Sequence, residues 1–270
     1  MTEKISVGLI GVGSMGGALL RGWLEANVLD LAKSAVFDPA IGDTLTAELK
    51  KHGVAVNPSP DAARVDILIV AVKPQIASEV LPAFAALAKN AIIVSVMAGK
   101  SIASVSRAFS GASRVMRAMP NLPASIGKGA SGLYAPETID APARAAIERL
   151  VAVSGEIVWV ETEEAIDFVT AVSGSGPAYF FLMTEALASA GAALGLPEEA
   201  AQKLARATAI GAGALLEADP RSAQRLREAV TSPGGTTAAA LSVFENERAL
   251  RRLVADAAEA AANRAREMTV

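Results

Sequence analysis

Hydrophobic and polar positions along the first 160 residues of the chain predict strands and helices in alternation. Short apolar runs, typical of buried parallel strands, are separated by segments that carry apolar residues at helical spacing. Strands are expected at residues 5–10, 35–37, 54–56, 65–72, 91–96, 114–119 and 158–160. Such an alternation is typical of α/β proteins, so we predict a doubly wound sheet for this part of the chain.

The pattern changes after Glu161, where strand signals stop and helical periodicity continues. Helices are expected at residues 163–172, 177–195, 197–218, 222–230, 236–245 and 246–267, with breaks at Gly- and Pro-rich stretches. The segment from Tyr179 to Leu194 is apolar almost all round, which indicates burial on several sides. We therefore predict a Rossmann-type domain at residues 1–160 and an all-helical domain at residues 161–270, with a homodimer formed through the helices.

A glycine-rich turn joins the first expected strand to the first expected helix. It reads Gly11-Val12-Gly13-Ser14-Met15-Gly16, the G-x-G-x-x-G spacing of a dinucleotide-binding turn. Gly11 allows the tight turn, Gly13 lets the backbone approach a pyrophosphate, and Gly16 lets the helix pack closely on the strand. The free N–H groups of the helix then face the phosphates. We expect this turn to bind a dinucleotide, the alternative being a glycine-rich turn without a ligand.

Two polar residues follow other expected strands. Asp38 comes 22 residues after Gly16, near the spacing at which an acid binds the adenosine ribose of NAD. A carboxylate there would repel the additional phosphate of NADP, so Asp38 favours NADH. Lys73 follows a central strand at the edge where such sheets bind ligands. The alternatives are that Asp38 only starts a turn with Pro39 and that Lys73 is a solvated lysine.

Two glycine–serine motifs in the helical part differ from ordinary linkers. They span Ser173–Tyr179 and Thr231–Thr237, and each is expected just before a helix. Hydroxyl groups, unhindered backbone N–H groups and the positive end of a helix dipole together form an anion site without arginine. A small carboxylate is therefore a sensible substrate, whereas the simpler alternative is a pair of helix-capping loops.

Composition narrows the possible chemistry. The 270 residues are 52% hydrophobic and 20% charged, with a net charge of −3 and no cysteine, and no apolar run has the length of a membrane span. This argues against nucleic-acid and membrane partners, thiol nucleophiles and zinc–thiolate sites, and no metal site is expected. The single histidine, His52, is expected at a helix C-terminus. Because the first strand begins at once, without a targeting segment, we expect a cytoplasmic protein.

Five motifs, in order and spread over nearly the whole chain, resemble the pyrroline-5-carboxylate reductases, which make proline in its last biosynthetic step. The motifs are Gly11–Gly16, Ala71-Val72-Lys73-Pro74-Gln75, Arg117-Ala118-Met119-Pro120-Asn121, Ser173–Tyr179 and Thr231–Thr237. The resemblance implies NAD(P)H-dependent hydride transfer to the C=N carbon of 1-pyrroline-5-carboxylate, giving L-proline. It also implies a Rossmann domain followed by a helical dimerisation domain, and in the family such dimers assemble further into decamers of five dimers.

The same resemblance implies roles for individual residues. Ser232, Gly235, Thr236 and Thr237 would hold the substrate carboxylate and ring nitrogen, with the Thr237 hydroxyl as the catalytic hydrogen-bond partner of that nitrogen. Asn121 and Ser175 would line the same pocket. Ala71, Val72, Lys73, Pro74 and Ala98 would lie along the cofactor. Many family members prefer NADPH whereas Asp38 favours NADH, so both cofactors stay open.

Three other functions compete with this one. A β-hydroxyacid dehydrogenase shares the two-domain plan but needs a base, commonly a lysine, and nothing around Lys203 suggests that role. A reductase of another cyclic imine would use similar motifs. A non-catalytic dinucleotide-binding regulator would need no carboxylate pocket, so the two glycine–serine motifs argue against it.

Overall fold

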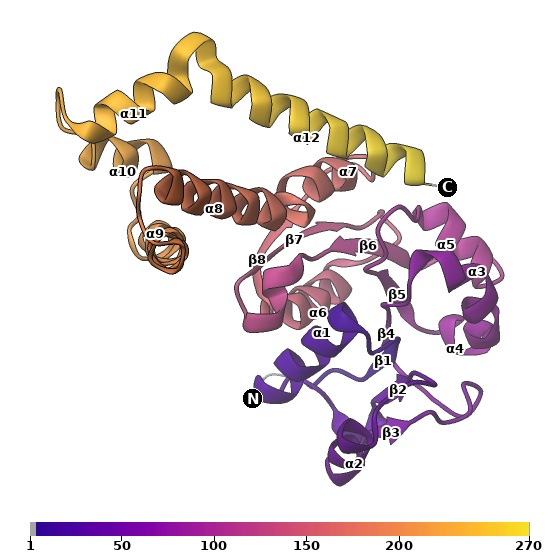
Figure 1. Ribbon diagram of the computed structural model, residues 1–270. Helices are drawn as coiled ribbons and strands as arrows, with labels where there is room; N and C mark the ends of the chain where they lie inside the picture. Colours follow the sequence, from indigo (N-terminus) through magenta and orange to yellow (C-terminus); the bar gives the residue numbers. More distant parts are fainter. Residues whose placement is uncertain (1–3, 270) are drawn as a thin grey trace. The chain divides into compact units, whose positions relative to one another are not determined.

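The computed structural model describes residues 4–269 and contains two compact units. The first unit runs to Ser175 and takes in the residues from Ala261 onward, and the second spans Gly176–Ala260 (Figure 1). The strands end before residue 161, where the sequence places a domain boundary, whereas the compact units divide between Ser175 and Gly176. The limits of the functional domains therefore stay a prediction.

The first unit is built on one eight-stranded sheet with the order β3-β2-β1-β4-β5-β6-β7-β8. The strands are β1 (Val7–Ile10), β2 (Ala35–Phe37), β3 (Ala55–Val56), β4 (Ile67–Val70), β5 (Ile92–Ser95), β6 (Val115–Met119), β7 (Gly129–Tyr134) and β8 (Gly155–Trp159). The first six run parallel in the order of a dinucleotide-binding fold, with β1 between β2 and β4. The strand β7 runs antiparallel to β6 and parallel to β8.

All seven predicted strands are present, but the sequence did not reveal β7. Its sequence, GASGLY, is made mostly of small residues and lacks the apolar run of a buried strand. The small residues are needed because α7 (Ala165–Val169) packs closely on this strand: a Cβ on Gly132 would lie 2.6 Å from the side chain of Val169. Because close packing requires small residues here, β7 lacks the apolar run that would identify it as a strand in the sequence.

Helices cover both faces of the sheet, as predicted for a doubly wound fold (Figure 1). The other helices of this unit are α1 (Ser14–Glu25), α2 (Asp43–Lys51), α3 (Ala77–Val80), α4 (Ala85–Ala88), α5 (Ile102–Ala108) and α6 (Ala141–Ala152). One hydrophobic core lies between the sheet and α1 with α6, and the second lies between the sheet and α3, α4 and α5. The helix α2 ends at His52, as predicted, and the left-handed Gly53 follows it. Ser101 caps α5 by accepting the N–H of Ser104.

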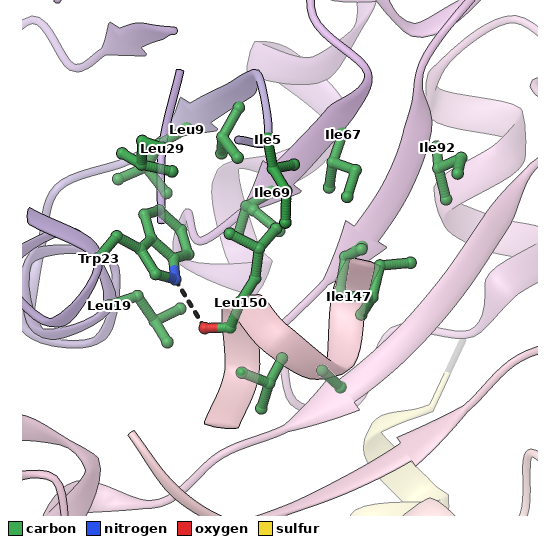
Figure 2. Close-up of a cluster of buried hydrophobic side chains, with 14 of the residues drawn as sticks. Ile5, Leu9, Leu19, Trp23, Leu29, Ile67, Ile69, Ile92, Ile147 and Leu150 are labelled. Atoms are coloured by element: carbon green, nitrogen blue, oxygen red, sulfur yellow. Dashed lines mark hydrogen bonds between the residues drawn. The ribbon is translucent and has the colours of Figure 1, made fainter. Parts of the chain in front are cut away.

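The indole of Trp23 connects α1 to α6 by a hydrogen bond within the core that these two helices form with the sheet. Trp23 is 1% exposed, and its Nε1 donates a hydrogen bond of 2.7 Å to the carbonyl oxygen of Leu150 (Figure 2). Leu19 and Ile147 lie in the same cluster of buried side chains. Because a buried indole N–H needs an acceptor, this bond fixes how α1 lies on the sheet, and α1 carries the glycine-rich turn at its start.

The second unit is helical. It contains α8 (Gly176–Ala193), α9 (Glu198–Ala218), α10 (Ala223–Ala229), α11 (Thr236–Glu245) and most of α12 (Ala249–Met268). Large apolar side chains along α8 face solvent in the single chain, and Phe180 is 72% exposed. Exposed apolar surface on this scale is typical of protein–protein interfaces. Among the described residues, the helices are too short or too polar to cross a membrane.

Candidate cofactor and substrate sites

The backbone of the glycine-rich turn explains each of its glycines. Gly11 has a φ of +93°, and a Cβ there would lie 2.8 Å from the carbonyl oxygen of Ala71. A Cβ on Gly16 would lie 2.1 Å from the carbonyl oxygen of Gly11, so only glycine allows α1 to start this close to β1. A Cβ on Gly13 would have no atom within 4 Å, which leaves open space beside the turn for a bulky ligand.

The N-terminus of α1 lies open beside this space. Gly13 is its N-cap residue, and within the described chain no side chain caps the helix and no acidic residue lies in its first turn. The intrahelical bonds start with the N–H of Gly17, which donates to the carbonyl oxygen of Gly13. The N–H groups of Ser14, Met15 and Gly16 precede that bond and can bind an anion. Together with the open space at Gly13, they fit a dinucleotide pyrophosphate.

The other predicted cofactor residues lie at the same edge of the sheet. The N–H of Ala71 donates to the carbonyl oxygen of Ile10, so the segment after β4 starts beside the glycine-rich turn. Lys73 is exposed and precedes a 3-10 helix that starts with Pro74. Ala98 follows β5 at the same edge. The structure thus brings Ala71–Pro74 and Ala98 to the side of the sheet where dinucleotides bind, while their individual contacts stay a prediction.

Asp38 lies directly against the glycine-rich turn. Its Oδ2 accepts a hydrogen bond of 2.6 Å from the N–H of Val12, and its Oδ1 accepts one of 2.8 Å from the N–H of Ala40. The carboxylate therefore starts the turn with Pro39 and also places a negative charge at the entrance to the dinucleotide site. The two interpretations of Asp38 from the sequence are compatible.

The first glycine–serine motif differs from the loop that the sequence predicts. Thr170–Gly174 forms a π-helix between α7 and α8, and the N–H of Ser175 donates to the carbonyl oxygen of Thr170 at 2.8 Å. Ser175 lies between this π-helix and α8, which begins at Gly176, so the motif spans the expected helix boundary and its role as an anion site stays a prediction. A π-helical turn often marks a functional position, so Ser175 stays a predicted substrate residue through its side chain.

Asn121 is buried and makes hydrogen bonds with its side-chain amide. Its Nδ2 donates to the carbonyl oxygen of Ser173 at 3.0 Å, and its Oδ1 accepts from the N–H of Ala130 at 2.9 Å. These bonds tie the loop after β6 to the π-helix and to β7. Asn121 therefore positions the segment that carries Ser175, and its predicted contact with the substrate stays a prediction.

A buried charged cluster lies beside these contacts, and the sequence showed it only as part of a motif. Arg117 is 2% exposed, its Nη1 lies 3.6 Å from Oε1 of Glu163, and its Nη2 has no hydrogen-bond partner among the described residues. The same Glu163 oxygen accepts the N–H of Ile102 at the start of α5. Burial lowers the pKa of Arg117, whereas Glu163 and Asp167 raise it. In the sequence, the one indication of this cluster was that the charged residue Arg117 lies within an expected strand.

The second glycine–serine motif forms a tight turn and belongs to the second unit. The N–H of Gly235 donates to the carbonyl oxygen of Ser232, and Gly234 between them has a φ of +71°. With Pro233 before it, this is the residue pattern of a type II turn. Gly235 is the N-cap of α11, which has neither a side-chain cap nor an acidic residue in its first turn. Thr236 and Thr237 occupy that first turn, so the predicted loop before a helix is confirmed.

Lys203, the residue weighed for a hydroxyacid dehydrogenase, lies on the exposed face of α9. Its side chain is 75% exposed and pairs with Glu199 one helical turn away at 2.7 Å. Nothing in its surroundings supports that competing function.

Two family models match the chain. The model described as pyrroline-5-carboxylate reductase dimerisation matches residues 163–268, and one described as NADP oxidoreductase, coenzyme F420-dependent, matches residues 6–99. The two matches fall on the helical part and on the dinucleotide-binding part of the fold. The first also supports an oligomeric protein.

Proteins of known name resemble the chain over its whole length. A pyrroline-5-carboxylate reductase of Pseudomonas aeruginosa is 37% identical over 97% of this chain and 96% of its own. The structure of a pyrroline-5-carboxylate reductase from Coxiella burnetii superposes with a TM-score of 0.89 at 34% identity, covering 99% and 100% of the two chains. That of a pyrroline carboxylate reductase from Plasmodium falciparum, with NADP bound, superposes with a TM-score of 0.81 at 27% identity, covering both chains completely.

The chain therefore belongs to the pyrroline-5-carboxylate reductase family and is an NAD(P)H-dependent oxidoreductase. This confirms the resemblance, the enzyme class and the fold class predicted from the sequence. The family does not by itself assign roles to single residues of this chain.

Proposed function

We propose that the chain catalyses the reduction of 1-pyrroline-5-carboxylate to L-proline, the last step of proline biosynthesis, with one NAD(P)H and one proton consumed per turnover. The observation that supports this most directly is a shared feature of α1 and α11. Both begin at a glycine with neither a side-chain cap nor an acidic residue in the first turn. By contrast, Asp140 caps α6, and α2 and α9 carry acidic residues in their first turns.

Two uncapped helix N-termini suit the two anions that the reaction involves. The N-terminus of α1 binds the pyrophosphate of the cofactor, and that of α11 binds the carboxylate of the substrate. The tight turn at Ser232–Gly235 keeps the approach to α11 free of side-chain bulk, while the hydroxyls of Ser232 and Thr236 add polar partners. In the first unit, Asn121 positions the π-helical segment that leads to Ser175, and the Ser175 side chain is a further proposed substrate contact.

The protein's contribution to the chemistry is alignment and hydrogen bonding. Reduced nicotinamide supplies the hydride when it is bound. The chain holds the imine carbon in position to receive it, and the imine nitrogen is protonated from solution. The Thr237 hydroxyl forms a hydrogen bond with that nitrogen, and this role requires neither histidine nor cysteine.

The second unit supports a homodimer as the functional form. Its exposed apolar side chains and the match to a dimerisation family both favour an association of two copies through the helices. We extend the proposal to a decamer of five such dimers and to a cytoplasmic location. Size-exclusion chromatography with light scattering tests the assembly directly.

The enzymatic proposal is tested by following oxidation of NADH and of NADPH in parallel with pyrroline-5-carboxylate as the acceptor. Turnover with either cofactor supports the proposal. If neither cofactor supports reduction of pyrroline-5-carboxylate but a six-membered cyclic imine is reduced, that imine is the substrate. Binding of a dinucleotide without reduction of any imine would favour a non-catalytic regulator.

A further inference from the structure

The end of β3 makes an unusual contact with the end of β2. The side-chain Oδ1 of Asn57 accepts the N–H of Asp38 at 2.8 Å, and its Nδ2 donates to the carbonyl oxygen of Asp38 at 2.9 Å. The N–H of Asn57 itself donates to the carbonyl oxygen of Val36. Asn57 has a φ of +49°, a left-handed conformation that asparagine tolerates better than most residues. Its amide thus continues the β2–β3 pairing past the last backbone bond and holds the main chain of Asp38 on both sides.

The carboxylate of Asp38 is held separately from its main chain. Val12 in the glycine-rich turn donates its N–H to one oxygen at 2.6 Å, and Ala40 donates its N–H to the other at 2.8 Å. Hydrogen bonds to an ionised acceptor are the stronger ones. Asn57 fixes the main chain of Asp38, and two N–H groups fix its carboxylate. The negative charge of Asp38 therefore has one position, against the glycine-rich turn.

The charges of the segments that follow β2 and β3 favour a ribose without a phosphate. The segments that follow β2 and β3 carry Asp38, Asp43 and Asp61, and their first basic residues are Lys50 and Arg64. Lys50 lies in the last turn of α2. Arg64 precedes β4 at the opposite edge of the sheet, and its Nη1 donates to backbone carbonyl oxygens beside it. A site for the 2′-phosphate of NADP needs a cation close to the ribose.

We propose that Asn57 is a positioning residue that gives this enzyme a preference for NADH, by fixing Asp38 where the adenosine ribose binds. The inference rests on the proposed function for the identity of the cofactor, but it concerns binding and can be tested without turnover. Removing the Asn57 amide frees the main chain of Asp38, so its carboxylate no longer has one fixed position. Removing the charge of Asp38 eliminates the preference for NADH over NADPH itself.

The direct test is isothermal titration calorimetry of the full chain with NADH and with NADPH. Asn57→Gly keeps the left-handed backbone and removes the side-chain amide. The Kd for NADH should rise about tenfold, because Asp38 loses two hydrogen bonds and must then be ordered when the ribose binds. The Kd for NADPH should change by less than about twofold, because no favourable contact with its phosphate is lost. Asn27→Gly is the matched control, since Asn27 also has a left-handed φ, of +54°, and its side chain pairs with Lys4 instead.

A double-mutant cycle tests whether Asn57 acts through Asp38. Asp38→Asn removes the negative charge and should tighten NADPH binding about tenfold, because the carboxylate no longer repels the 2′-phosphate. If Asn57 acts only through Asp38, Asn57→Gly in the Asp38→Asn background should weaken NADH binding by less than in the wild type.

Two results would overturn the inference. One is a wild-type chain that binds NADPH more tightly than NADH. The other is an Asn57→Gly variant that loses affinity for both cofactors equally, since this would reduce Asn57 to a structural residue of the sheet. Failure of the proposed function has a different signature, namely an intact preference for NADH without reduction of pyrroline-5-carboxylate.

Discussion

The side-chain amide nitrogen of Asn121 lies 3.0 Å from the carbonyl oxygen of Ser173, and this bond joins the loop after β6 to the π-helix before α8. Two further contacts join β6 to the stretch from Glu163 to Gly174. The guanidinium of Arg117 faces Glu163, and the methyl end of Met119 packs against Gly174, where a Cβ would lie 2.9 Å away. Residues at alternate positions of one strand and its exit loop thus hold the segment that leads to Ser175.

Replacement of Asn121 by aspartate should weaken this connection. The carboxylate cannot donate to the carbonyl oxygen of Ser173, so two acceptors would face each other in a buried position. We expect a loss of about 1–3 kcal/mol in the free energy of unfolding and a KM for pyrroline-5-carboxylate that rises more than the KM for the cofactor. Urea unfolding and steady-state kinetics measure the two effects.

Ser125→Ala is the comparison for Asn121→Asp, because the Ser125 hydroxyl makes an exposed hydrogen bond to Leu122 in the same loop. It should change stability by less than about 0.5 kcal/mol. A full loss of activity in Asn121→Asp with unchanged stability would contradict the positioning role and would make Asn121 a direct substrate ligand.

Removal of the Arg117 side chain should destabilise the first unit strongly. Arg117→Met would leave Asp167, which is 4% exposed, and Glu163 without their cation. Loss of one partner of a buried ion pair costs about 3–5 kcal/mol. Thermal and urea unfolding check the expectation, with Lys203→Ala as the control, because that exposed pair with Glu199 should contribute less than about 1 kcal/mol. Equal losses in the two variants would show that the Arg117 cluster contributes no more than a surface pair.

The glycine-rich turn allows cofactor binding to be separated from folding. A methyl group at residue 16 would collide with the backbone of Gly11, whereas one at residue 13 would enter open space. Gly16→Ala should therefore lower both the melting temperature and NADH affinity. Gly13→Ala should leave the melting temperature of the free chain unchanged and weaken NADH binding at least about tenfold, through a clash with the pyrophosphate.

The control for both glycines is Gly42→Ala, at the start of α2, where a Cβ also has no neighbour within 4 Å. Calorimetric titration of the three variants with NADH gives the affinities. Unchanged affinity in Gly13→Ala would show that the pyrophosphate does not approach the turn at this point.

Much of this fold could be predicted from the sequence because its signals are local. The central strands are unbroken apolar runs, and the glycine-rich turn has a fixed spacing that its close contacts require. The helix end at His52 follows from the chemistry of helix C-termini. In each case the residues that form the feature are neighbours in the sequence, so their pattern alone indicates the structure.

The features that the sequence did not reveal depend on distant partners. The bonds of Asn121 and Asn57 to segments elsewhere in the chain follow from how the strands are arranged, and neither asparagine has a neighbouring motif that identifies its partner. The π-helix at Thr170–Gly174 extends beyond residue 172, where the sequence predicts the helix to end, because Ser173 and Gly174 usually break helices. Tertiary packing overrides that local preference here.

The last prediction concerns Thr237, in the first turn of α11. Thr237→Ala removes the hydroxyl proposed to bind the ring nitrogen and should leave the helix intact, since alanine favours helix and α11 has no side-chain cap to lose. We expect kcat to fall about a hundredfold, as for other single hydrogen-bond donors in active sites. Thr237→Ser keeps the hydroxyl and should retain most of the activity. Ser242→Ala, on the same helix, removes a hydroxyl that only bonds the backbone of Ala239 and should leave kcat unchanged. An unaltered kcat/KM in Thr237→Ala would exclude Thr237 from the chemical step, and an equal loss in Thr237→Ser would show that the shape of the side chain, rather than its hydroxyl, is what matters.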